Sequence, residues 1–79
     1  MNKKEFRVEM VKNNDNQTTL AEAMGLPQSA ISARINGITE FRQNEIDFIR
    51  RRWSLSDART IDIFFTDEVS AQDTVEKGA

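Results

Sequence analysis

The sequence contains no cysteine and no histidine, two residue types on which many catalytic and metal sites depend. Their absence excludes disulfide bonds and the usual zinc sites. It also excludes catalysis by Cys–His pairs and by Ser–His–Asp triads. No apolar run exceeds a few residues, so the sequence predicts neither a transmembrane span nor a signal peptide.

The chain of 79 residues is long enough for one domain at most. A domain of this size buries only about 60% of the surface of its unfolded chain, which leaves little room for a catalytic cleft. The net charge of −2 is unevenly distributed: residues 1–56 hold nine Lys/Arg and seven Asp/Glu, whereas residues 57–79 hold two and six. We therefore expect a mildly basic folded domain over residues 1–66 and an acidic, flexible tail over residues 67–79.

Residues 17–37, QTTLAEAMGLPQSAISARING, predict two short helices joined by a tight turn. Each helix carries an apolar stripe, at Leu20, Ala21 and Met24 in the first and at Ile31 and Ile35 in the second. Gly25 can take the positive φ angle that ends a helix, and Pro27 is suited to open the next one. Leu26 places an apolar side chain in the corner between them. This arrangement is typical of a helix-turn-helix, whose second helix is presented to solvent.

The same stretch gives the sequence its resemblance to a known family. The matching positions are Gln17, Leu20-Ala21, Met24-Gly25-Leu26, Gln28, Ile31 and Ile35-Asn36-Gly37. The pattern resembles the DNA-binding domain of the lambda-type phage repressors and Cro proteins, the large xenobiotic-response-element-like family. It is more similar still to short regulators of Gram-positive phages and mobile elements, whose counterparts here are Ala30–Gly37, Phe41, Glu45-Ile46 and Ile63-Phe64-Phe65. The resemblance covers about residues 5–66 and implies an all-α fold, a compact bundle of about five short helices containing a helix-turn-helix.

The second helix, expected over residues 28–36, is the candidate reader of DNA bases. Its isoleucines face inward, which leaves an exposed side of four residues: Gln28, Ser29, Ser32 and Ala33. The first turn of such a helix reaches deepest into the major groove, where a glutamine amide can pair with adenine. Small polar residues are also common on a solvated surface. We favour base contacts because no acidic residue lies between positions 26 and 38.

Six further residues are expected to contact DNA phosphates: Gln17, Thr18, Arg34, Asn36, Thr39 and Arg42. Gln17 and Thr18 form the first turn of a helix capped by Asn16, where free N–H groups and the helix dipole favour an anion. The resemblance places Gln17 at a phosphate-contacting position, and an ordinary helix cap is the alternative. Arg34 either reaches a phosphate or a guanine, or is a surface arginine. The resemblance also implies phosphate contacts from the loop at residues 38–42, although Glu40 disfavours an anion there.

The first helix is predicted from the spacing of Asn2 and Glu5, which is that of a capping box, and from the apolar pair Phe6 and Met10. Its basic residues, Lys3, Lys4, Arg7 and Lys12, fall on the remaining surface. They form either a solvated helix face or, at Lys3 or Lys4, a phosphate contact.

Two more helices are predicted in the second half of the chain. The inner face of one is formed by Ile46, Ile49 and Trp53, and that of the other, which runs to about residue 65, by Ala58, Ile61 and Phe65. The run Arg50–Arg52 is a DNA contact, a partner-facing patch or a helix end stabilised by the dipole, and we favour the helix end. Because apolar residues exceed the needs of a small core, we expect a dimer or partner surface of Trp53, Ile63, Phe64 and Phe65. Packing of these residues within the monomer is the alternative.

The leading interpretation is a sequence-specific DNA-binding transcriptional regulator, a repressor of Cro or phage-repressor type. Its partner would be double-stranded DNA, bound as a homodimer on an inverted repeat. The alternative is a modulator of another repressor, or an antitoxin, that keeps the fold but binds DNA weakly alone. We do not expect an enzyme, a metal or a cofactor, because the sequence offers no nucleophile–base pair and no metal cluster. We expect a cytoplasmic location, at the nucleoid when DNA is bound.

Overall fold

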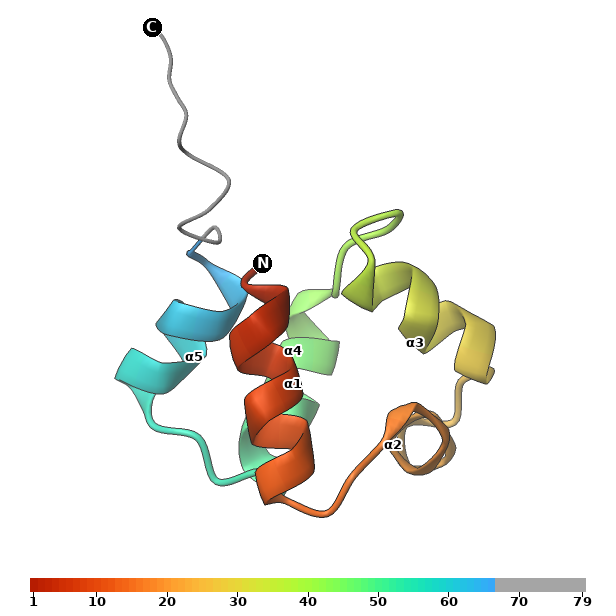
Figure 1. Ribbon diagram of the computed structural model, residues 1–79, viewed down its shortest axis with the longest axis horizontal. Helices are drawn as coiled ribbons and strands as arrows, with labels where there is room; N and C mark the ends of the chain where they lie inside the picture. Colours follow the sequence, from red (N-terminus) through yellow and green to blue (C-terminus); the bar gives the residue numbers. More distant parts are fainter. Residues whose placement is uncertain (67–79) are drawn as a thin grey trace, which may run out of the picture.

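The computed structural model describes residues 1–66, which form five α-helices and no strand (Figure 1). The helices are α1 (Lys3–Lys12), α2 (Gln17–Met24), α3 (Gln28–Ile35), α4 (Gln43–Arg52) and α5 (Asp57–Phe64). The expected all-α bundle of short helices is therefore confirmed. Among the described residues, no helix has the length and apolar character that crossing a membrane requires. The predicted acidic tail, residues 67–79, lies outside the described part of the chain.

Side-chain caps start three of the helices. The Oδ1 atom of Asn2 accepts a hydrogen bond from the backbone N–H of Glu5 at 3.1 Å, and Ser56 caps α5 in the same manner. At the start of α2, Asn16 accepts from the N–H of Thr19 at 2.9 Å, and the Thr19 hydroxyl accepts from the N–H of Asn16 at 2.9 Å. These bonds satisfy N–H groups that have no partner within the helix. The predicted N-caps of α1 and α2 are confirmed.

Every helix contributes one fully buried side chain to a single core. These side chains are Phe6, Leu20, Ile31, Ile49 and Ile63, in the order α1 to α5. Burying a side chain of this size stabilises the fold by about 1.5–3 kcal/mol. The Phe6 ring lies at the centre of an aromatic group, with ring centroids 5.5 Å from Phe41, 5.1 Å from Trp53 and 5.9 Å from Phe64. The core therefore joins all five helices.

The predicted inner face of α5 is wrong. That prediction placed Ala58, Ile61 and Phe65 inward, whereas the structure buries Thr60, Ile63 and Phe64. Ile61 is 54% exposed and Phe65 is 61% exposed. Both sets of residues have helical spacing, so periodicity alone does not choose between them. The contacts of α5 with α1 decide which set faces the core.

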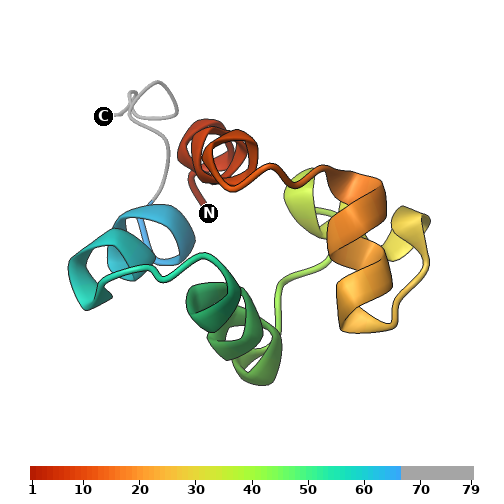
Figure 2. The same cartoon turned by 90° about the horizontal axis from the view of Figure 1, so that it is seen from below.

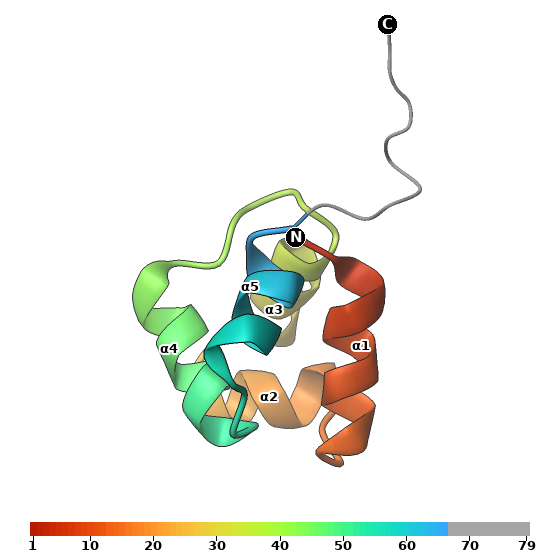
Figure 3. The same cartoon turned by 90° about the vertical axis from the view of Figure 1, so that its left-hand side faces the viewer.

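Helices α1 and α5 lie side by side (Figure 3). Polar contacts join them. The Arg59 guanidinium donates from Nε to Glu9 at 2.7 Å and from Nη2 to Glu5. The backbone N–H of Asn2 donates to the Ile63 carbonyl at 2.7 Å. The start of α1 is thereby held beside the end of α5. Helices α2 and α3 lie at the opposite end of the molecule from α5 (Figures 1 and 2).

Candidate nucleic-acid interface

Helices α2 and α3 pack against each other around a three-residue connection. Gly25 takes a left-handed conformation, with φ +71°, and the Leu26 N–H then donates to the Ala21 carbonyl at 2.9 Å. The predicted positive φ angle of Gly25 is therefore confirmed, and so is the apolar corner at Leu26, because Leu26 packs against the core. In Figure 1, α2 is seen almost end-on while α3 runs across the picture, so the two helices cross steeply. Pro27, in an extended conformation, directly precedes the first turn of α3.

The four residues predicted to contact bases all belong to α3. Ile31 and Ile35 are buried, as the sequence indicates. Gln28 and Ser29 are exposed in the first turn, whereas Ser32 and Ala33 are half-buried further along. All four therefore belong to one helix, and Gln28 and Ser29 are the most accessible of them. Together they offer hydrogen-bonding groups and a methyl group, and no negative charge.

The start of α2 is fixed in place by Asp15, a residue that sequence reasoning missed. Asp15 is a buried carboxylate that accepts from Arg52 Nε at 2.8 Å and Nη2 at 2.9 Å, from Trp53 Nε1 at 2.7 Å and from Thr19 Oγ1 at 2.9 Å. The hydrogen bond from Arg52 is the main cause that lowers the pKa of Asp15 to about 2. These contacts join the α2 cap to the end of α4. Gln17, half-buried, and the exposed Thr18 form the α2 turn that follows the cap.

The segment after α3 contains three of the residues predicted to contact phosphates. Asn36 is the C-cap of α3, and Gly37 follows in a left-handed conformation with φ +78°. Asn36, Thr39 and Arg42 are all exposed. Lys3 of α1 approaches this segment, with its Nζ atom 3.5 Å from Asn36 Oδ1. A cation from another helix therefore lies beside the candidate interface.

The structure removes Arg34 from the predicted phosphate contacts. Its guanidinium forms a bidentate ion pair with Glu45, in which Nε and Nη2 each donate at 2.9 Å, and Nη1 donates to the Ala30 carbonyl at 3.1 Å. The two side chains are only 13% and 10% exposed. Burial alone raises the pKa of Glu45, but hydrogen bonds from Arg34 and the Arg42 backbone lower it below its usual value. Arg34 thus joins α3 to α4 instead of facing solvent.

The predicted dimer or partner surface is wrong for three of its four residues. Trp53 is 4% exposed, Ile63 is fully buried and Phe64 is 9% exposed, so all three belong to the core. Their packing within the monomer was the alternative interpretation. The exposed apolar side chains of α5 and its C-cap are Phe65 and Ile61, because the helix is rotated relative to the prediction. Only Phe65 remains from the predicted surface.

Six of the seven arginines of the described chain fall into two groups. Arg34, Arg52 and Arg59 bind the buried or half-buried carboxylates of Glu45, Asp15, Glu5 and Glu9. Arg7, Arg42 and Arg51 are exposed. The run 50–52 ends α4, as predicted, and there Arg50 lies 3.5 Å from Asp57. Counting charged residues therefore overestimates the cations that could bind an external anion.

Among residues 1–66, no group of three or more acidic side chains is arranged to hold a metal ion. Comparisons of the chain with protein-family models, with curated proteins and with solved structures gave no significant match. The geometry described above is therefore the basis for the functional argument.

Proposed function

We propose that this protein is a sequence-specific DNA-binding transcriptional regulator in which α2 and α3 act as a helix-turn-helix. Helix α3 would lie in the major groove, with Gln28, Ser29, Ser32 and Ala33 facing the bases. The protein would act in the cytoplasm, without catalysis, as a repressor of phage or mobile-element type. Repression would follow when the bound protein excludes RNA polymerase from the promoter.

The observation that carries this proposal is the packed α2–α3 pair with a polar outward side on α3. Helix α3 is anchored by Ile31 and Ile35, so its outer side is free for a ligand while its inner side holds the fold. Residues 27–39 contain no Asp or Glu. An acidic side chain in this stretch would face phosphate oxygens and oppose binding. The composition of this surface therefore favours a polyanionic partner.

Three surfaces around α3 would hold the DNA backbone. The N–H groups in the first turn of α2, at Gln17 and Thr18, lack partners within the helix and could donate to a phosphate. The loop after α3 supplies Thr39 and Arg42, both exposed. Asn36, with Lys3 beside it, would complete this set. Phosphate contacts of this kind provide most of the affinity and position the reading helix.

A single α3 reads only a few base pairs, so useful specificity requires a second copy. We propose a homodimer on an inverted repeat, with Ile61 and Phe65 in the contact between protomers. Both side chains are more than half exposed and belong to the last helix and its C-cap. Exposed apolar side chains of this size are typical of interface cores.

The test is selection of bound duplexes from a random library at roughly physiological salt, near 0.15 M. We expect an enriched inverted repeat. The same selection with Gln28→Ala should lose the preference at one base position of each half-site, because the amide that pairs with that base is absent. Gln43→Ala, at an exposed position in the first turn of α4, is the matched control and should leave the preference unchanged. If the selection enriches no sequence, the proposal is overturned.

A second candidate is a partner-binding modulator of another repressor, or an antitoxin. The observation that favours it is the use of Arg34, Arg52 and Arg59 in ion pairs within the fold, which leaves fewer cations for phosphates. Under this alternative the protein would retard no duplex DNA by itself and would bind a second regulator. Pull-downs with the native protein and with the Phe65→Ser variant would test this surface, because a partner that binds there should be retained by the native protein and lost with the variant.

A further inference from the structure

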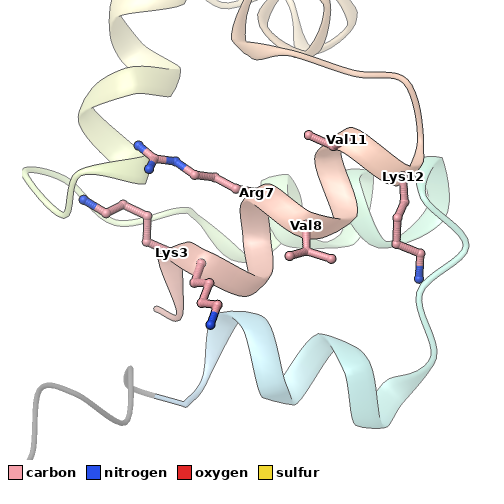
Figure 4. A pocket seen from close by; sticks show the side chains of 6 residues that line it. Lys3, Arg7, Val8, Val11 and Lys12 are labelled. Atoms are coloured by element: carbon pink, nitrogen blue, oxygen red, sulfur yellow. The ribbon is translucent and has the colours of Figure 1, made fainter.

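The outer side of α1 is a basic face with two exposed valines. We define the α1 basic face as the six residues that line a shallow pocket on this helix: Lys3, Lys4, Arg7, Val8, Val11 and Lys12. Figure 4 shows side chains of this face projecting from α1 along its length, with basic residues towards both ends. Val8 is 41% exposed and Val11 is 70% exposed.

The acidic residues of the same helix offset only part of the positive charge of this face. Glu5 and Glu9 lie on the side of α1 that faces α5, where both bind Arg59. Lys12 forms an ion pair with Glu9 at 3.6 Å. A helix side with four cations and two exposed valines fits an acidic segment that also carries small apolar side chains.

We propose that residues 67–79 of this same chain bind to the α1 basic face. The segment has the complementary composition, since it contains four acidic residues and one lysine, for a net charge of −3. It also contains two valines that could cover Val8 and Val11. Its acidic residues and valines are Asp67, Glu68, Asp73 and Glu76, and Val69 and Val75.

The position at which the described chain ends makes this contact accessible. The Asn2 N–H bonds the Ile63 carbonyl at 2.7 Å, so the chain leaves α5 beside the first turn of α1. Residues 67–79 can extend over up to about 45 Å, whereas the ten residues of α1 span about 15 Å. The segment can therefore reach every cation of the face. Because both surfaces belong to one chain, binding benefits from a high effective concentration even though each exposed ion pair is weak.

This inference does not rest on the proposed DNA binding, and its test contains no DNA. The protein has no native cysteine, so Ala71→Cys provides a single site for a nitroxide spin label on the full chain. The spin label broadens the NMR signals of amides close to it. We expect the amides of Val8 and Val11 to lose most of their intensity and the amide of Arg51, on α4, to keep it. Broadening that is weak and even over residues 1–66 would overturn the proposal.

Three controls identify the interaction and the segment that occupies the face. Lys4→Gln combined with Arg7→Gln should restore the α1 signals, while Arg51→Gln, which removes another exposed arginine, should not. Raising the NaCl concentration from about 0.05 M to about 0.5 M should also restore them, because it shortens the Debye length several-fold. Mixing isotope-labelled protein that has no spin label with spin-labelled protein detects binding between molecules. Broadening in this mixture equal to that within one molecule would overturn the proposal in favour of a second copy's segment.

Discussion

Replacing Asp15 with asparagine should destabilise the protein at neutral pH and remove part of its sensitivity to acid. The Asp15 side chain is 4% exposed and binds Arg52 in a bidentate ion pair, with Nε at 2.8 Å and Nη2 at 2.9 Å. Asparagine keeps an oxygen that can accept from Trp53 Nε1, which lies 2.7 Å away in the native protein. It cannot keep the charge. The substitution therefore isolates the ion pair from the packing around it.

The size of the effect follows from the pKa of Asp15. Hydrogen bonding from Arg52 is the largest cause lowering that pKa from 3.8 to about 2, which corresponds to about 2 kcal/mol. Because the Arg52 side chain is 36% exposed, solvent screening makes this value an upper bound. The folded-state pKa lies below the unfolded one, so the stabilisation is present above about pH 5 and is lost as the pH falls towards about 2.

Urea denaturation followed by circular dichroism, at several pH values between about 7 and 2.5, measures the free energy of unfolding and its dependence on pH. At neutral pH, Asp15→Asn should lower the free energy of unfolding by up to about 2 kcal/mol, and the midpoint temperature by about 10 °C. The difference from the native protein should shrink as the pH falls. Asp62→Asn, which removes an exposed carboxylate of α5, should change stability by less than about 0.5 kcal/mol. A difference that stays constant down to acidic pH would refute the assignment of the effect to the Asp15 charge.

Three further predictions concern other parts of the molecule. Glu45→Gln leaves the largely buried Arg34 guanidinium without its counter-charge, so chemical denaturation should show that the free energy of unfolding falls by about 3 kcal/mol. An unchanged free energy of unfolding would contradict the stabilising role given to this ion pair. If DNA binding is as proposed, Arg42→Gln should weaken binding to all duplexes alike and reduce the slope of log affinity against log salt by about 1 per protomer, whereas Arg51→Gln should leave the slope unchanged. If the protein dimerises as proposed, Phe65→Ser should abolish dimers in sedimentation equilibrium and leave the helical circular dichroism spectrum unchanged, because Phe65 is exposed in the monomer; dimers that persist would exclude this interface.

Local patterns in the sequence were sufficient to predict most of the helical framework. Asn2 and Asn16 cap helices because their side chains reach an N–H three residues further on, a relation that is visible in the sequence. Gly25 ends α2 because it tolerates a positive φ angle. The apolar stripe of α3 correctly identified Ile31 and Ile35 as core residues. Each of these predictions depends on residues within one or two turns of one another.

Contacts between distant residues could not be predicted in this way. Asp15 and Arg52 are 37 positions apart, and Arg59 binds a glutamate 54 positions away. Nothing in the local spacing distinguishes these arginines from exposed ones. The error at α5 has the same origin, since the contact of Arg59 with α1 and the bond from Asn2 to Ile63 determine which side of the helix faces inward. The phosphate contact predicted for Arg34 fails for the same reason, because its partner, Glu45, lies on the next helix and is not visible in the local pattern.

The ion pairs also explain why net charge is a poor guide to the partners of this protein. The arginines that bind Asp15, Glu45 and the two glutamates of α1 stabilise the fold, so the exposed cations left for an external anion include those of the α1 basic face, Arg42 and Arg51. Lys3 belongs to that face and lies beside Asn36 of the candidate interface. If residues 67–79 bind α1 and DNA binds α3, the acidic segment and the DNA compete for the same cation, Lys3. Binding of one should then weaken binding of the other, and by thermodynamic linkage the two effects must be equal. Neutralising the acidic residues of the segment should accordingly raise the affinity for DNA.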